Sequence, residues 1–190
     1  MNRPICVSAL WIAGLFCGHA FAQKTTSASL SVASSMTQNT CYINGVQQNG
    51  SSVASISIRL PTVSKADFST AGKLGPVIVG TTSKGSNIAL TSCPANTNVA
   101  LALDGTGSID TTTGTYKNTT TGGAGNMNVQ VVNAESGINT ALMPTGTNKI
   151  TKTTDGTGAA NFLLGARYYA TAAVTAGQFT TTVGFNITYP

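Results

Sequence analysis

Apolar and polar residues alternate in short runs along this chain, and no stretch keeps the spacing of an amphipathic helix. Seven runs predict β-strands, because their side chains alternate between two faces or are β-branched. The predicted strands are residues 53–60, 77–79, 87–91, 98–103, 127–133, 161–170 and 179–189. Short strands at this spacing are typical of a β-sandwich. We therefore predict an all-β fold.

Turn-forming residue pairs separate the apolar runs. They are Asn44-Gly45, Asn49-Gly50, Asp104-Gly105 and Asp155-Gly156. Such pairs tolerate positive φ and predict chain reversals. Two longer stretches, 105–126 and 145–159, are rich in Thr and Gly and contain few apolar side chains, so we predict exposed loops there. The first stretch could also separate two domains, but neither side has enough strands to close a core alone, which favours one domain.

The beginning of the chain has the layout of a secretory signal peptide. Arg3 precedes an apolar run over residues 5–16, and residues 20–22 read Ala-Phe-Ala. This arrangement predicts export and cleavage after Ala22. The apolar run is shorter than the roughly 20 residues that a membrane-spanning helix needs.

A lipid anchor on Cys17 is the alternative interpretation of this leader. Signals of that kind have a small residue directly before the cysteine, whereas this chain has Phe16. We therefore predict a signal peptide at 1–22, an N-terminal extension at 23–40 and a folded domain at 41–190.

Composition and charge narrow the classes of function. Of the 190 residues, 41% are hydrophobic and 8% charged, which is typical of a globular domain. The ten basic and five acidic residues are spread thinly and lack the clustered positive charge of a nucleic-acid-binding protein. We expect no nucleic acid among the partners.

The exported protein would contain no histidine, because His19 lies in the leader. This removes the usual general base, the Ser/His and Cys/His nucleophile pairs and the commonest zinc ligand. The sequence also contains no Walker phosphate loop and no EF-hand run of acids. Two carboxylates could still meet in space, but Asp104 and Asp155, like Arg167, are interpreted as turn or surface residues. We predict no enzymatic activity, no metal and no cofactor.

Export also decides the state of the last two cysteines, Cys41 and Cys93, because Cys6 and Cys17 leave with the leader. An oxidising compartment favours pairing, and one pairing is available. We predict a disulfide between Cys41 and Cys93; two buried free thiols are the alternative.

The C-terminal run 179–189 predicts a long strand with one apolar face. Its apolar positions are Phe179, Val183, Phe185, Ile187 and Tyr189, and its other face carries Thr, Gly and Asn. A strand that brings this much apolar surface to a core normally has a neighbour on each side. We expect a segment from elsewhere to lie beside it.

The extension 23–40 has a weaker alternating pattern. Every second position carries Ala28, Leu30, Val32, Ser34 or Met36. Three interpretations are open: a solvated arm, an arm folded back on its own domain, or a strand that completes the sheet of another copy.

Several short segments recur in the order of a known protein family. They are 41–45 (CYING), 60–63 (LPTV) with Phe68 and Gly72 after it, 88–93 (IALTSC), 99–105 (VALALDG), 168–170 (YYA), and 176–177 (AG) before a tail with a penultimate Tyr189. In these segments the chain resembles the pilin subunits of chaperone-usher fimbriae, close to the type 1 major fimbrial subunits, over nearly all of the sequence after the leader.

The resemblance implies an incomplete immunoglobulin-like β-sandwich that lacks its final strand and carries an N-terminal donor-strand extension. The donor side chains would be Ala28, Leu30, Val32, Ser34 and Met36. The acceptor groove and chaperone-recognition residues would be Gly177, Phe179, Val183, Phe185, Ile187 and Tyr189. Two positions depart from the family pattern: Ser34, where glycine is frequent, and Pro190, where a polar residue is usual.

The resemblance also implies a structural role. The subunit would pass through the periplasm with a chaperone, reach an outer-membrane usher and join neighbouring pilin subunits in a cell-surface fimbria that supports adhesion. A fimbrial adhesin or minor tip adaptor that binds a host glycan, for example through 105–126, is the alternative. Tip adhesins of the family usually have an extra lectin domain, and only residues 23–40 precede Cys41 here, which favours the structural subunit.

Overall fold

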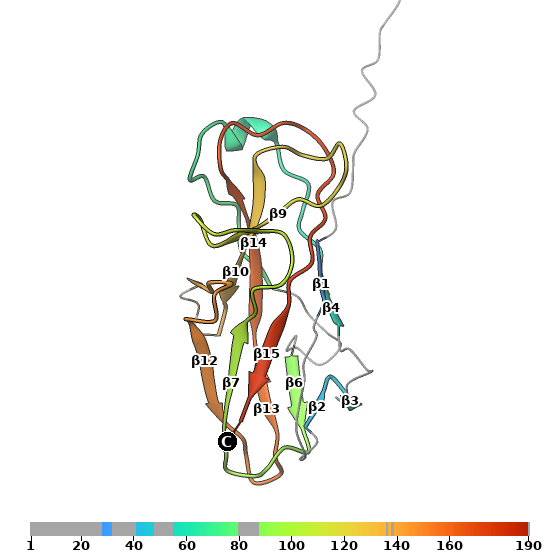
Figure 1. The fold of residues 1–190 in the computed structure, drawn as a ribbon, viewed down its shortest axis with the longest axis vertical. Helices are drawn as coiled ribbons and strands as arrows, with labels where there is room; N and C mark the ends of the chain where they lie inside the picture. Colours follow the sequence, from blue (N-terminus) through green and yellow to red (C-terminus); the bar gives the residue numbers. More distant parts are fainter. Residues whose placement is uncertain are drawn as a thin grey trace, which may run out of the picture.

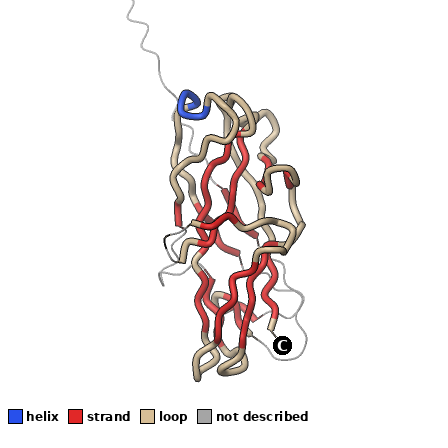
Figure 2. The backbone as a smooth tube through the Cα atoms, turned by 90° about the vertical axis from the view of Figure 1, so that its left-hand side faces the viewer, coloured by secondary structure: helices blue, strands red, loops and turns tan. Residues whose placement is uncertain are grey.

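The computed structural model describes residues 28–31, 41–47, 55–79, 88–135, 137 and 139–189. The described chain is almost entirely β-structure, with strands that run mainly along the long axis of the molecule (Figures 1 and 2). The strands are β1 (Ala28–Ser31), β2 (Tyr42–Ile43), β3 (Val46–Gln47), β4 (Ser55–Ile58), β5 (Ile78–Val79), β6 (Ile88–Thr91), β7 (Asn98–Leu103), β8 (Ile109–Asp110), β9 (Thr115–Lys117), β10 (Met127–Asn133), β11 (Thr140–Ala141), β12 (Lys149–Thr153), β13 (Ala160–Phe162), β14 (Leu164–Ala170) and β15 (Phe185–Thr188). A short 3-10 helix, η1 (Lys65–Phe68), follows β4.

The strands form four antiparallel sheets. One sheet has the order β12-β7-β15, and a second has the order β13-β6-β2-β3. The largest has the order β5-β14-β10-β9-β8, with β11 beside β10, and β1 pairs with β4 in the fourth. The all-β fold predicted from the alternating pattern is confirmed.

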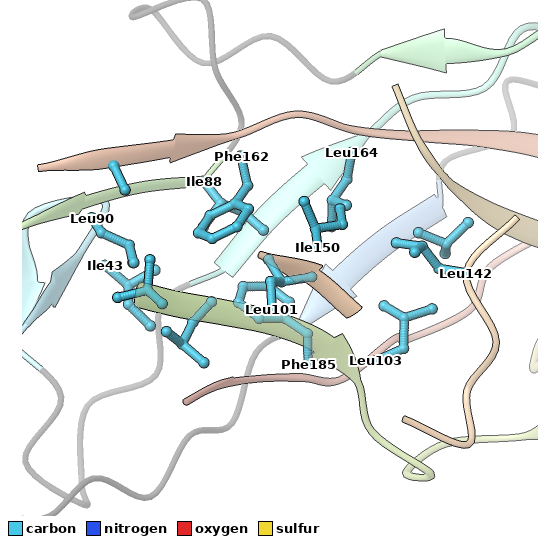
Figure 3. Packing of buried hydrophobic residues seen from close by; sticks show 14 of the residues in the cluster. Ile43, Ile88, Leu90, Leu101, Leu103, Leu142, Ile150, Phe162, Leu164 and Phe185 are labelled. Carbon is cyan, nitrogen blue, oxygen red and sulfur yellow. The ribbon is translucent and has the colours of Figure 1, made fainter. Parts of the chain in front are cut away.

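The main core lies between the first two sheets and the lower part of the third, as in a sandwich. Leu101 and Leu103 of β7 and Phe185 of β15 belong to the same cluster as Ile88 of β6 and Phe162 of β13, and all five are at most 1% exposed (Figure 3). Burial of such side chains stabilises a fold by about 1.5–3 kcal/mol each. The alternating pattern of each strand therefore directs one face to a shared core.

A second core cluster joins β10, β14 and η1 to the start of the C-terminal segment. Tyr168 is its centre, because it makes edge-to-face contacts with Phe68 at 6.2 Å and with Phe179 at 5.8 Å between ring centroids. Pairs in this geometry contribute about 0.5–1.5 kcal/mol beyond burial. The cluster fixes the entry of the C-terminal segment into the sandwich.

The predicted strands agree with the structure in the middle of the chain. The bounds of β7 and β10 are those expected, and β4, β5 and β6 lie inside their predicted ranges. The run 161–170 divides into β13 and β14 at Leu163, whose backbone N–H donates to the Glu135 carboxylate at 3.1 Å. The alternating pattern thus predicts where a strand lies more reliably than where it is interrupted.

The two Thr- and Gly-rich stretches are not simply exposed loops, and this prediction is wrong. The first contains β8 and β9, with Tyr116 fully buried, and the second contains β12, with Ile150 buried on β7. Threonine is itself a good strand residue. One large apolar side chain in each strand is therefore enough to attach it to the sheet.

Turns form at the predicted pairs through two different devices. Asn44 and Gly45 both have positive φ, 52° and 80°, and close the β2–β3 hairpin. Asp104 and Asp155 instead accept hydrogen bonds from backbone N–H groups two residues later, at 3.0 and 2.8 Å. The pair Asn49-Gly50 lies outside the described residues, as do the leader and its cleavage site.

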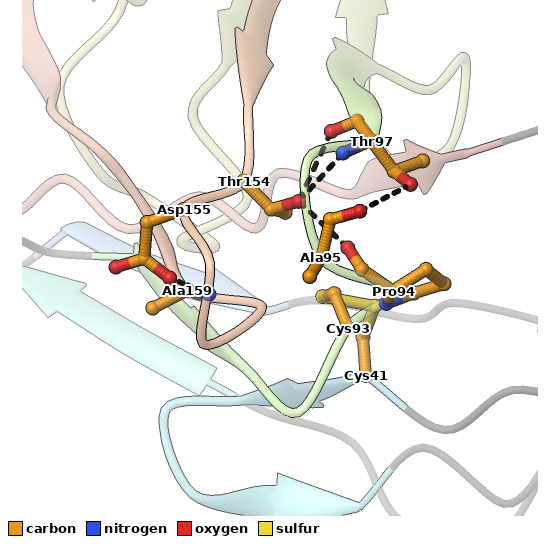
Figure 4. Close-up of a disulfide and its surroundings, with 8 residues drawn as sticks. All are labelled: Cys41, Cys93, Pro94, Ala95, Thr97, Thr154, Asp155 and Ala159. Atoms are coloured by element: carbon orange, nitrogen blue, oxygen red, sulfur yellow. Dashed lines mark hydrogen bonds between the residues drawn. A yellow bond between two sulfur atoms is a disulfide. The ribbon is translucent and has the colours of Figure 1, made fainter.

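The predicted disulfide between Cys41 and Cys93 is confirmed, with 4.4 Å between the Cα atoms (Figure 4). Nearby, the buried Thr154 hydroxyl donates to the Pro94 carbonyl at 2.6 Å and accepts from the Thr97 N–H at 2.9 Å. The bridge joins the start of β2 to the end of β6. It anchors the first residue of the predicted domain to the sandwich.

Candidate functional site

The C-terminal segment keeps its alternating burial along its length. Phe179, Val183, Phe185 and Ile187 are at most 4% exposed, and the partly buried Tyr189 packs against the main core. The intervening Thr and Asn side chains at 180, 182, 186 and 188 are exposed. The predicted residues thus lie on one buried face, which also carries the buried hydroxyl side chain of Thr181.

The predicted single strand over 179–189 is too long, however, because only β15 (Phe185–Thr188) belongs to a ladder. Its partner is β7, with Asn186 opposite Ala102. Just before β15, the carbonyl of Gly184 accepts from the Asp104 N–H at 3.1 Å. Beyond Asp104 the neighbouring chain leaves β7 and turns, so that no regular ladder continues.

The direction of the backbone groups follows from this register. Backbone groups of successive residues in an extended chain point to opposite edges. Since Gly184 bonds toward β7, those of Asn186 also face β7, while those of Phe185 and Ile187 face the opposite edge. Among the described strands, β7 is the one that pairs with β15. The outer edge of β15 is therefore a sheet edge in the part of the chain that the structure describes.

Before β15, the C-terminal segment forms hydrogen bonds with the loop 118–126 instead of with β7. The loop lies on the same side of the segment as β7. The Ala124 N–H donates to the Gln178 carbonyl at 2.9 Å, and the Thr119 N–H donates to the Thr180 carbonyl at 2.8 Å. The backbone groups of Gln178, Thr180, Gly184 and Asn186 thus face the rest of the domain. The backbone groups of Phe179, Phe185 and Ile187 face the opposite edge.

Gly177 lies where this loop crosses the C-terminal segment. A Cβ atom on Gly177 would come closer than 3.0 Å to the backbone of both Gly123 and Ala124. Real Cβ atoms essentially never approach other atoms so closely. The crossing therefore requires a residue without a side chain, which is a reason within the domain for a glycine that the family resemblance assigns to chaperone recognition.

A cavity of ≈ 230 Å³ opens beside Gly177 and Phe179. Its apolar lining includes Met127, Tyr168 and Val174. The structure thus places a pocket at the start of the apolar face, which sequence reasoning did not identify because its lining comes from four separate stretches.

The two outer strands of the β12-β7-β15 sheet differ in charge. β12 carries Lys149 and Lys152, and Lys152 forms an ion pair with Glu135 at 2.9 Å. β15 carries no charged residue. Lysines on an edge strand prevent pairing with other chains. The edge strand β12 therefore carries lysines of the kind that hinder pairing with other chains, whereas β15 carries none.

The predicted donor residues are described only in part. Ala28 and Leu30 lie in β1, whose backbone pairs antiparallel with β4 of the same chain, Ala28 opposite Ile58 and Leu30 opposite Ile56. Val32, Ser34 and Met36 lie outside the described residues. In the structure, residues 28–31 are thus folded onto their own chain, one of the three arrangements considered for the extension.

Carboxylates of the described chain support turns. Hydrogen bonds from the Thr157 hydroxyl and nearby N–H groups lower the pKa of Asp155. Burial acts to raise the pKa of Asp110, but hydrogen bonds from Thr113 and Thr112 and the charge of Lys117 outweigh it and lower the pKa. Within the described ranges, no three His, Cys, Asp or Glu side chains are grouped to hold a metal. The same ranges contain no helix long and apolar enough to span a membrane.

Comparison with known proteins gives consistent matches. A family model described as fimbrial protein matches residues 27–190. The chain is 32% identical over 157 residues to the F17 fimbrial protein of Escherichia coli, covering 79% of this chain and 80% of the relative. It is 33% identical over 139 residues to the major fimbrial subunit SMF-1 of Stenotrophomonas maltophilia (strain K279a), covering 70% and 77%. A solved Burkholderia pseudomallei antigen and type I fimbria protein has a TM-score of 0.47 and 21% identity, covering 86% of this chain and 94% of that one.

Proposed function

The chain belongs to the fimbrial protein family, a family of structural rather than catalytic proteins, and on this premise we propose that it polymerises by donor-strand exchange. In this proposal, the outer edge of the C-terminal segment receives the N-terminal extension of a neighbouring subunit. Each subunit then donates a strand from its N-terminal extension and receives a strand beside its C-terminal segment. Such a head-to-tail contact does not close on itself and builds a filament.

The uncharged edge of β15 is the observation that carries the proposal. An exposed edge presents N–H and C=O groups that can pair with another chain. β12 at the other side of the sheet is protected by Lys149 and Lys152, while β15 has no such protection. Main-chain hydrogen bonds at the β15 edge would supply affinity, and pockets for alternate side chains would supply specificity.

The donor in this proposal is the segment 23–40. Its alternate residues Ala28, Leu30, Val32, Ser34 and Met36 match the spacing with which an added strand directs side chains into a groove. The pairing of β1 with β4 occupies one hydrogen-bonding edge of residues 28–31. In the proposal, these residues leave β4 when they are donated to another subunit.

Delivery by a periplasmic chaperone and an outer-membrane usher belongs to the same proposal. A strand edge beside apolar side chains favours aggregation until it is covered. A chaperone that lends a strand would cover it, and Tyr189 together with Phe179 and Gly177 would lie on the surface that it contacts. Co-expression tests this step: the subunit should stay soluble in the periplasm with its chaperone and aggregate without it.

Deletion of residues 23–36 tests the donor assignment. The deleted subunit should still receive a strand but should not donate one, so that it can occupy only one end of a fibre. A finer test compares Val32→Lys with Ala33→Lys, a matched control one residue along. Val32→Lys should abolish fibres, since a charge cannot enter an apolar groove without a large penalty, while Ala33→Lys should leave them. The measurement is fibre length by electron microscopy.

Two results would contradict the proposal. One is a deleted subunit that still joins its neighbour through its own N-terminus. The other is equal fibre formation by Val32→Lys and Ala33→Lys, because the two side chains would then lie in equivalent surroundings.

The major fimbrial subunit SMF-1 among the relatives favours a shaft role over a glycan-binding tip role.

A further inference from the structure

We propose that Asn118 is a positioning residue that extends the receiving edge from β15 back to Phe179. The inference rests on the proposed strand addition and names the group that prepares the edge for it. β15 alone offers only four residues, Phe185–Thr188. The buried apolar face of the C-terminal segment begins earlier, at Phe179.

The side-chain amide of Asn118 bonds to the C-terminal segment as a backbone peptide would. Its Nδ2 donates to the Gln178 carbonyl at 2.7 Å, and its Oδ1 accepts from the Thr180 N–H at 3.0 Å. In a parallel ladder, one residue bonds in this way to the two residues that flank its partner. Asn118 therefore replaces a strand beside Phe179, at a place where the chain has no strand to offer.

The remaining hydrogen-bonding capacity of Asn118 holds its own loop. Nδ2 also donates to the Ala124 carbonyl at 3.0 Å, and Oδ1 also accepts from the Thr120 N–H at 3.0 Å. All four positions of the amide are thus used. The side chain is fixed at both ends, and it fixes residues 178–180 in an extended conformation.

This conformation directs the backbone of Phe179 to the receiving edge. Since the Gln178 carbonyl and the Thr180 N–H and carbonyl face the loop, the N–H and carbonyl of Phe179 face the opposite side. This is the edge shared with Phe185 and Ile187. An added strand could then pair along the whole apolar face rather than along β15 alone.

Residue-resolved hydrogen exchange tests the proposal. The full exported chain is saturated with a synthetic peptide of residues 23–40, and amide exchange is followed by NMR. In the unmodified protein, the peptide should slow exchange at Phe179, Phe185 and Ile187. In Asn118→Ala, exchange at Phe179 in the complex should be about tenfold faster, because two hydrogen bonds that order this stretch are lost. Phe185 and Ile187 should change less than about twofold.

Two further variants separate positioning from general stability. Asn118→Asp keeps an oxygen for the Thr180 and Thr120 N–H groups but loses the donor to Gln178, and it should also loosen Phe179. Asn98→Ala is the control, because this exposed amide at the start of β7 accepts a hydrogen bond from the Thr153 hydroxyl at 2.8 Å and makes none to residues 178–180 among the described contacts. It should leave Phe179 unchanged.

The possible failures are distinguishable. If the peptide slows none of the three amides in the unmodified protein, the proposed strand addition is wrong. If it slows them equally in the unmodified protein and in both Asn118 variants, the role of Asn118 is wrong. If both variants exchange faster at all three amides or bind no peptide, Asn118 is a general structural residue and the proposal is also overturned.

Discussion

Substitution of Gly177 by alanine tests the crossing between the C-terminal segment and the loop 118–126. The added Cβ would meet backbone atoms of Gly123 and Ala124, which cannot rotate away, and ordinary contact requires a displacement of about 1 Å. Overpacking of this kind costs about 1–3 kcal/mol. The displacement also lengthens the 2.9 Å bond from the Ala124 N–H to Gln178, worth about 1 kcal/mol. We expect a loss of about 3 kcal/mol.

The measurement is equilibrium urea unfolding of the subunit complemented with the peptide of residues 23–40. Far-ultraviolet circular dichroism is the suitable probe, because the single tryptophan, Trp11, lies in the predicted leader. With a slope of about 2 kcal/mol per molar urea, the midpoint should fall by about 1.5 M. The matched control is Gly156→Ala, where a Cβ meets nothing within 4 Å; it should be neutral or slightly stabilising.

The result also separates two explanations of this glycine. If Gly177 serves chaperone recognition alone, Gly177→Ala should unfold at the same urea concentration as the unmodified complex and should fail only in chaperone binding. A midpoint shift below about 0.3 M would therefore refute the tight crossing. A shift of the expected size would show that the family's glycine is required inside the domain as well.

Three other predictions concern stability. Replacing Cys41 and Cys93 by serine should reduce the unfolding free energy by about 4 kcal/mol, since the bridge closes a loop with a sequence separation of 52; urea titration measures it, and a loss under about 1 kcal/mol would contradict it. The pKa of Asp155 is lowered, first of all by the hydrogen bond from the Thr157 hydroxyl. The ionised carboxylate therefore stabilises the fold above the unfolded pKa of 3.8, and this stabilisation is lost as the pH falls through the folded pKa. The melting-temperature difference between the unmodified protein and Asp155→Ala should shrink below about pH 4. Burial raises the pKa of Tyr116, so absorbance titration should show this phenol ionising after the exposed ones, and only on unfolding if the packing is tight.

The sequence predicts the part of the fold that depends on side-chain alternation. β7 and β10 have the predicted bounds, and the C-terminal face from Phe179 to Ile187 is buried at the predicted positions. Alternation works here because each strand has one face toward a shared core. The disulfide was predictable for a different reason, since the predicted removal of the leader leaves one pairing available.

The parts that could not be predicted depend on contacts between distant segments. The ladder of the last strand ends at Phe185 because β7 ends at Leu103, and nothing in the C-terminal pattern contains that information. The polar loop 105–126 reads as solvent-exposed, yet Tyr116 in it is fully buried. Asn118 gives no signal at all in the sequence, because its importance arises from the position of Gln178 beside it.

The two ends of the chain have the matching lengths that the proposed strand addition requires. If Asn118 keeps residues 178–180 extended, the receiving edge runs from Phe179 to Ile187, about nine residues or about 30 Å. The alternating part of the extension, from Ala28 to Met36, has the same length. An edge limited to β15 would cover less than half of that segment. Under this proposal the length of the donor depends on a side-chain amide of the receiver, and a donor shortened by four residues should lose the protection of one end of the edge while it keeps the other.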